Sequence, residues 1–98
     1  MTTSAINYQN LSKSLNILRA LAHPIRMSIL SLIDENKVIN VNKIYRSLHL
    51  EQSITSQHLR ILRTANLVNT KRDGKFIFYT INYGTIKRVV NSTANFFK

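Results

Sequence analysis

Residues 50–68 read LEQSITSQHLRILRTANLV, and this stretch decides the fold that the rest of the chain supports. Its pattern predicts a helix from near Gln52 to about Ala65, followed by Asn66, a residue type that tolerates the left-handed conformation of a helix end. One face of that helix carries polar side chains at helical spacing, namely Ser53, Ser56, Gln57 and Arg60. The opposite face, which we expect to pack on the core, carries Ile54, His58, Ile61, Leu62 and Ala65.

The polar face suits the edges of base pairs in the major groove of DNA. Gln can bond both N6 and N7 of adenine, Ser can bond base edges or phosphates, and Arg can bond guanine or phosphate. No acidic residue lies between Gln52 and Ala65, whereas a helix face that only meets water usually alternates Glu and Lys. We therefore expect this helix to enter the major groove.

The segments on either side complete a recognisable pattern. A shorter helix over residues 41–48 precedes the stretch, and His49-Leu50-Glu51 connects the two helices. Two strands are predicted at 67–72 and 76–82, with Asp73-Gly74 between them as a strong hairpin signal. Two helices joined by a short turn and followed by a basic hairpin indicate a winged helix-turn-helix.

The rest of the chain supplies further helices and a short extended piece. Helices are predicted near residues 6–22, from Pro24 onward, and over 83–97, with an extended piece at 38–40. The fold is therefore expected to be mainly helical with a small β-hairpin. Its expected order is helix, helix, short strand, helix, helix, strand, strand, helix, in one domain spanning residues 1–98.

The charge of the chain points to a polyanionic partner. Fourteen Lys and Arg against four Asp and Glu give a net charge of +10 in 98 residues, which attracts nucleic acid or an anionic membrane surface. No apolar run reaches the roughly 18 residues of a membrane span. A cysteine count of zero excludes disulfides and thiolate metal sites. Without a visible signal peptide, we expect a cytoplasmic protein.

Half of the net charge lies between residues 41 and 75, where seven basic residues face only two acidic ones. Three of the seven flank the tip of the predicted hairpin, and such a wing can reach the neighbouring minor groove or its phosphates. We expect contacts to the DNA backbone from Lys43, Arg46, Arg63, Lys71, Arg72 and Lys75.

Three stretches resemble the ArsR/SmtB family of bacterial regulators. LRALAHPIRMSIL, residues 18–30, resembles the opening helices of the family, residues 50–68 resemble its helix-turn-helix, and KRDGKFIFYTI, residues 71–81, resembles its wing. The resemblance runs from about Leu11 to the last helix. It implies a transcriptional regulator, and in particular a repressor, that binds an inverted repeat of double-stranded DNA as a homodimer.

The resemblance also implies roles for individual positions. It implies DNA contacts from Gln52, Ser53, Ser56 and Gln57. Family members are typically joined through their first and last helices, and this chain has spare apolar surface on both, since a short chain with amphipathic ends can bury more in a dimer. The expected interface residues are Leu11, Leu15, Leu18, Ile86, Val89, Val90 and Phe97.

Some positions depart from the family pattern. Glu51 stands where Ser or Thr often caps the recognition helix, and Asn66 stands where Gly is usual. Many relatives sense metals through Cys of the third helix or through His and carboxylates of the last helix, and their redox sensing needs thiols. The matching segments here, VINVNKIYRS (residues 38–47) and YGTIKRVVNSTANFFK (residues 83–98), contain no Cys, His, Asp or Glu. We therefore expect no metal and no cofactor, and the inducer stays open.

The histidines and carboxylates suggest no catalytic or metal site. We expect His23 to cap or pack, His49 to lie in the turn within reach of a phosphate, and His58 to be a hydrogen-bonded core residue. Four carboxylates form no acid–base pair and no phosphate-binding loop is present, so an enzyme is not expected. Two alternatives remain: a winged helix used as a protein-interaction module, and a metal sensor with an unrecognised site.

Overall fold

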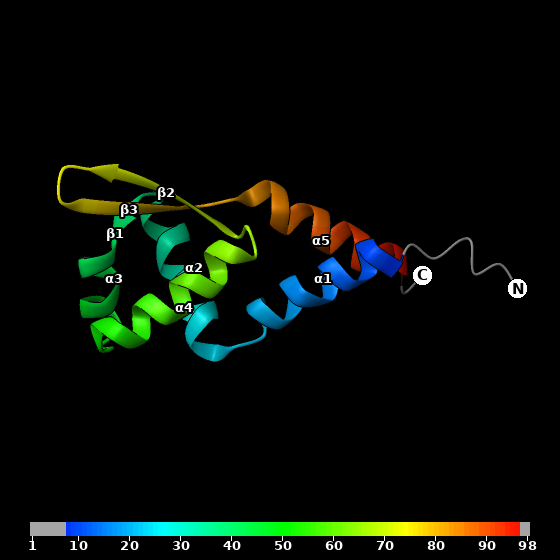
Figure 1. The fold of residues 1–98 in the computed structure, drawn as a ribbon, viewed down its shortest axis with the longest axis horizontal. Coiled ribbons are helices and arrows are strands. Elements are labelled where there is room, and N and C mark those ends of the chain that lie inside the picture. The colour runs from blue at the N-terminus through cyan, green and yellow to red at the C-terminus, as the bar shows by residue number, and fades with distance from the viewer. Residues whose placement is uncertain (1–7, 97–98) are drawn as a thin grey trace, which may run out of the picture.

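The computed structural model describes the backbone of residues 8–96 and the side chains of residues 12–91. The elements follow in this order: α1 (Tyr8–Leu21), α2 (Pro24–Asn36), β1 (Ile39–Asn40), α3 (Val41–Ser47), α4 (Gln52–Thr64), β2 (Val68–Asp73), β3 (Phe76–Ile81) and α5 (Tyr83–Phe96). This order confirms the predicted winged helix-turn-helix, with internal boundaries that differ by a residue or so (Figure 1). The predicted outer ends, Ile6 and Phe97, lie outside the described residues.

Two helices begin at side-chain caps that the sequence supplies. His23 lies just before α2 in an extended conformation, and its Nδ1 accepts a hydrogen bond from the Ile25 N–H at 3.2 Å. Pro24 follows at the first helical position, where its missing N–H removes no helical bond. The Asn40 side chain caps α3 in the same way, accepting from the Lys43 N–H at 2.9 Å.

Both helices of the helix-turn-helix end at a residue in the left-handed conformation. His49 follows α3 with φ of 54°, and Asn66 follows α4 with φ of 62°. Each helix end has the two hydrogen bonds of a Schellman motif. After α3, the Leu50 N–H donates to the Tyr45 carbonyl at 2.9 Å and the His49 N–H to the Arg46 carbonyl at 3.3 Å. After α4, the Leu67 N–H donates to the Leu62 carbonyl at 2.9 Å and the Asn66 N–H to the Arg63 carbonyl at 3.0 Å. The predicted role of Asn66 is confirmed, and His49 proves to end α3 in the same way.

The strands form a small antiparallel sheet in the order β1-β3-β2. Asp73 pairs with Phe76, so the two turn residues are Gly74 and Lys75 and not Asp73-Gly74 as the sequence suggested. Gly74 has φ of +63°, which suits glycine at the first central position of a tight hairpin turn. The shift leaves Lys75 at the tip of the wing.

The core lies between α2, α3, α4 and the sheet, and its most buried side chains are Ile29, Ile33, Ile39, Ile44, Leu59, Leu62 and Leu67. The buried side chains of α4 are Thr55, Leu59 and Leu62. The prediction that Ile54 and Ile61 face the core is therefore wrong, because both are exposed. Thr55 fits inside because its hydroxyl donates a hydrogen bond to the Glu51 carbonyl at 3.0 Å.

Helices α1 and α5 pack against each other and extend away from the rest of the molecule, at the end opposite the hairpin (Figure 1). Ala20 of α1 and Val89 of α5 are buried. The Tyr83 hydroxyl donates to the Asp34 carboxylate, which ties the start of α5 to α2. Within the described residues, no helix has the length and apolar character needed to cross a membrane.

Candidate nucleic-acid interface

Helix α4 presents its polar face to solvent, as the recognition helix of this fold must. The five residues predicted to contact bases are all exposed: Gln52, Ser53, Ser56, Gln57 and Arg60. The opposite side of the helix is held in the core by Thr55, Leu59 and Leu62. Because a major groove is about as wide as one α-helix with its side chains, a helix anchored in this way can enter it with the polar face leading.

The start of α4 has no side-chain cap, since the carboxylate of Glu51 accepts no hydrogen bond from the N–H groups of the first turn. The sequence anticipated this weakness of Glu51 as a cap. The Glu51 carbonyl instead accepts bonds from both the N–H and the hydroxyl of Thr55, each at 3.0 Å. The first N–H groups of the helix therefore remain available to water or to a phosphate oxygen.

The wing carries its basic side chains outward. Lys71, Arg72 and Lys75 are all exposed on β2 and the turn. The ammonium of Lys75 lies 5.6 Å from the centre of the Phe76 ring, a distance at which a cation is attracted to an aromatic face. The β2–β3 hairpin extends past α3, so these cations lie at one end of the molecule (Figure 1).

A hollow of about 440 Å³ separates the second half of α4 from β3. It is lined by Ser56, Arg60, Arg63, Thr64 and Tyr79. Burial raises the pKa of the Tyr79 hydroxyl, while the nearby charge of Arg63 opposes that rise. The sequence did not single out Tyr79, because alternation along a strand does not tell which aromatic side chain will border a helix.

His58 belongs to a small polar cluster behind the recognition face. Its Nδ1 accepts a hydrogen bond from Arg26 Nε at 3.3 Å, and its ring centre lies 4.7 Å from that of His23. Arg26 Nη1 also donates to the carbonyls of Arg19 and Ala20 at the end of α1, at 3.4 and 3.2 Å. Arg26 thus links α1 to α4, a role that its position in α2 did not reveal from sequence.

The cluster favours the neutral form of His58. Burial lowers the pKa of His58 below its ordinary value, and electrostatic interactions with His23 and Arg26 lower it further. His58 is half-buried and hydrogen-bonded, which agrees with the expected packing role. His23 both caps α2 and packs against the ring of His58, so each of the two roles considered for it is present.

The basic side chains of the interface have no carboxylate partner among the residues that the structure describes. Across residues 12–91, the single salt bridge joins Lys37 to Asp34 at 3.7 Å, away from α4 and the wing. The six residues expected to contact the DNA backbone are all exposed: Lys43, Arg46, Arg63, Lys71, Arg72 and Lys75. Their charges are therefore available to phosphates, since no carboxylate in the described part of the chain neutralises them.

Comparisons with known proteins agree with this geometry. The family model described as "Bacterial regulatory protein, arsR family" matches residues 23–70, from just before α2 into β2. The transcriptional repressor PagR of Bacillus anthracis is 33% identical over 85 residues, which cover 87% of this chain and 85% of PagR. The chain belongs to the ArsR family. The transcriptional activator HlyU of Vibrio cholerae is 34% identical over 82 residues, covering 84% of this chain and 75% of HlyU.

A solved structure of one of these relatives shares most of the fold. The crystal structure of PagR aligns with a TM-score of 0.73 and 31% identity, covering 89% of this chain and 99% of that structure. The family membership and the fold predicted from residues 50–68 are thus both confirmed. Two helices of this ArsR-family chain, α3 and α5, contain no Cys, His, Asp or Glu. Within the described residues, no three or more such side chains come together in a way that could hold a metal ion.

The residues expected at the dimer interface of this ArsR-family chain lie in different surroundings. Leu15 is 43% exposed and Val90 is 59% exposed, while Leu18 and Ile86 are half-buried. Val89 is only 3% exposed, so the chain itself already encloses that side chain. Helical spacing alone could not separate Val89 from Val90. The side chains of Leu11 and Phe97 lie outside the described part of the chain.

Proposed function

We propose that this chain represses transcription as a homodimer that binds an inverted repeat in duplex DNA, with α4 of each copy in the major groove. Its family membership gives the coarser part, because the chain is a DNA-binding transcriptional regulator of the ArsR family. The observation that carries the finer proposal is the exposed face of α4, which holds hydroxyl, amide and guanidinium groups and no carboxylate.

The site divides into groups that choose the sequence and groups that supply affinity. We assign base contacts to Gln52, Ser53, Ser56, Gln57 and Arg60, whose side chains share the outer side of α4. We assign phosphate contacts to the exposed Lys and Arg of α3, α4 and the wing, because such contacts position the protein but carry no sequence information. The first group should set specificity and the second should set the dependence on salt.

The apolar side chains exposed on α1 and α5 support a homodimer. Leu15 and Val90 expose apolar surface that a second copy would cover. A two-fold axis through these helices would place the two α4 helices in successive major grooves, about 34–36 Å apart. An operator with matching two-fold symmetry follows from that arrangement.

The test is fluorescence anisotropy with the duplex upstream of the gene for this chain and a scrambled duplex, across a series of salt concentrations. A DNA-reading homodimer gives a steep negative slope of log affinity against log salt, and at least ~10³-fold preference for the upstream duplex. A protein-interaction module would bind both duplexes weakly and equally. That result would overturn the proposal.

The sign of regulation needs its own measurement, because the relatives include a repressor and an activator by name. Transcription in vitro from the upstream template should fall as the protein is added. A rise in transcript would contradict repression while leaving DNA binding intact. Equilibrium dialysis against divalent metals tests the remaining alternative, since a metal sensor would retain metal in stoichiometric amount.

A further inference from the structure

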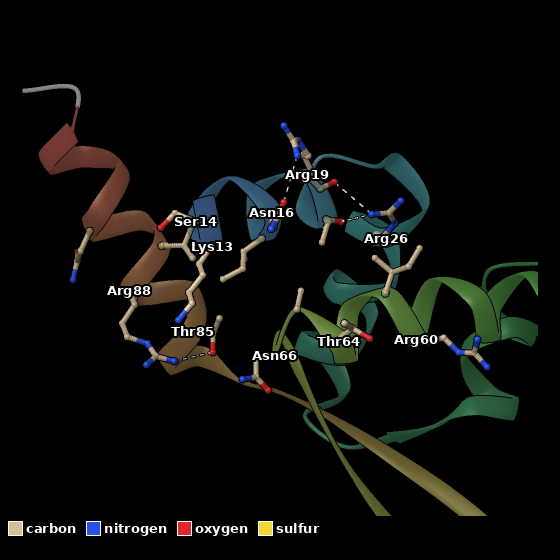
Figure 2. Close-up of a pocket in the computed structure, with 16 residues that line it drawn as sticks. Lys13, Ser14, Asn16, Arg19, Arg26, Arg60, Thr64, Asn66, Thr85 and Arg88 are labelled. Atoms are coloured by element: carbon tan, nitrogen blue, oxygen red, sulfur yellow. Dashed lines mark hydrogen bonds between the residues drawn. The ribbon is translucent and has the colours of Figure 1, made fainter. Parts of the chain in front are cut away.

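A second and larger hollow lies on the other side of α4, between that helix and the α1–α5 pair. This groove of about 1140 Å³ is bordered by all three helices and by the start of α2 (Figure 2). Its lining includes no acidic residue and five basic ones: Lys13, Arg19, Arg26, Arg60 and Arg88. Three of these come from α1 and α5, and the roles assigned above leave the charges of two of them unused, Lys13 and Arg88.

Lys13 and Arg88 approach the same part of the groove from opposite helices. Figure 2 shows the Lys13 side chain pointing from α1 toward Thr85, with Arg88 beside Thr85 on α5 and Asn66 below. Arg88 Nη2 donates to the Thr85 hydroxyl at 3.1 Å, which orients the guanidinium and leaves other donors free. Lys13 has no hydrogen-bond or ion-pair partner among the residues that the structure describes. An anion here would meet both charges.

The groove and the smaller hollow flank the same part of α4. Arg60 and Thr64 line both of them, so the second half of α4 is a ridge with a basic depression on either side. A helix that lies in the major groove has one sugar-phosphate backbone along each of its sides. With α4 in the major groove, the smaller hollow with Arg63 would face one backbone and the groove would face the other.

The groove stays open in the proposed dimer. At 100° per residue, Lys13 lies about 160° around α1 from Leu15 and about 140° from Leu18. On α5, the exposed Val90 lies about 140° from Thr85 and about 160° from Arg88. The apolar stripe formed by Leu15, Leu18 and Val90 and the groove are therefore on different sides of the α1–α5 pair. A second copy would not complement the groove either, because α1 and α5 contain no acidic residue.

We propose that this groove receives the sugar-phosphate backbone of the DNA, and that Lys13 and Arg88 neutralise phosphates that α4 and the wing do not reach. The inference rests on the proposed function, since it adds a phosphate site to the same complex. It also gives α1 and α5 a second role, because the helices that join the two copies would hold DNA on their other side.

The test compares the wild-type chain with the double variant Lys13→Gln/Arg88→Gln by anisotropy on the upstream and scrambled duplexes. The loss of two phosphate contacts per copy should make the salt slope shallower by up to about 4 per dimer, while the preference between duplexes is kept. Lys87→Gln is the matched control, because it removes one charge from exposed α5 surface outside the groove and should leave the slope unchanged.

The outcomes separate this inference from the proposed function. A wild type with a steep slope and strong preference, together with an unchanged slope in the double variant, overturns the groove as a DNA site and leaves the function standing. A wild type without preference overturns the function itself. If sedimentation shows that the double variant changes the oligomeric state, the groove is an interface between copies and the inference is wrong. The variant Lys13→Arg/Arg88→Lys keeps both charges and should restore the wild-type slope.

Discussion

At the scale of single residues, the cluster of His23, Arg26 and His58 couples the recognition helix to the rest of the chain. The imidazole of His58 serves as a neutral acceptor for Arg26, which also holds two carbonyls at the end of α1. Protonation of His58 would remove the Nδ1 lone pair and place a positive charge beside the Arg26 guanidinium. The position of α4 relative to α1 therefore depends on His58 staying neutral.

Because of this cluster, the free energy of unfolding should decrease at mildly acidic pH. Because the pKa of His58 is lowered in the folded chain, the unfolded chain binds the proton more readily. The contribution is present above the ordinary pKa of about 6.5 and is lost as pH falls below it. Urea titrations at pH 7.5 and 5.5 should show a smaller loss of unfolding free energy for His58→Gln than for the wild type. Equal losses in both proteins would contradict this role of His58.

At the scale of elements, α4 shows how far the sequence alone could predict the site. The spacing of Ser53, Ser56 and Gln57 predicted the polar face correctly, because Ser and Gln side chains are mostly exposed in folded proteins. The core side was predicted correctly at Leu62 but wrongly at Ile54 and Ile61, which looked more apolar than the buried Thr55. A threonine that bonds its own helix backbone can be buried without cost from its hydroxyl, and no periodicity of apolar residues reports this.

The phase of α4 gives a matched pair of variants for stability. Leu59→Ala removes a side chain that is fully enclosed and should lower the free energy of unfolding by about 2–5 kcal/mol. Ile61→Ala truncates an exposed side chain two residues later and should change it by no more than about 0.5 kcal/mol. Denaturation in urea measures both values. A larger effect at Ile61 than at Leu59 would show that α4 is rotated from the orientation described.

At the scale of the whole molecule, α1 and α5 form a pair that extends from the helix-turn-helix unit and exposes apolar side chains. The sequence predicted which helices carry that surface, but not which of their residues the chain would bury itself. Long-range contacts such as the packing of Val89 and the Tyr83–Asp34 hydrogen bond decide this, and they join segments far apart in the sequence. The groove beside α4 went unpredicted for the same reason.

The proposed dimer can be tested at Val90. Val90→Glu places a charge in the exposed apolar stripe, where burial against a second copy would be strongly unfavourable. Sedimentation velocity should show the mass of two chains for the wild type and of one chain for the variant. The control Asn91→Glu adds the same charge at the next position, about 100° around α5, and should remain a dimer. Unchanged assembly of Val90→Glu would place the interface elsewhere.

The most direct measurement of whether α4 reads bases compares Gln57→Ala with Lys75→Ala by anisotropy on the upstream and scrambled duplexes. Gln57→Ala should reduce the preference for the upstream duplex by about 5- to 150-fold for each half-site and leave the salt slope intact, since one bidentate base contact contributes about 1–3 kcal/mol of discrimination. Lys75→Ala should keep the preference and lower the slope by up to about 2 per dimer. If Gln57→Ala weakens both duplexes equally, or leaves the preference unchanged, α4 does not read the sequence through this residue.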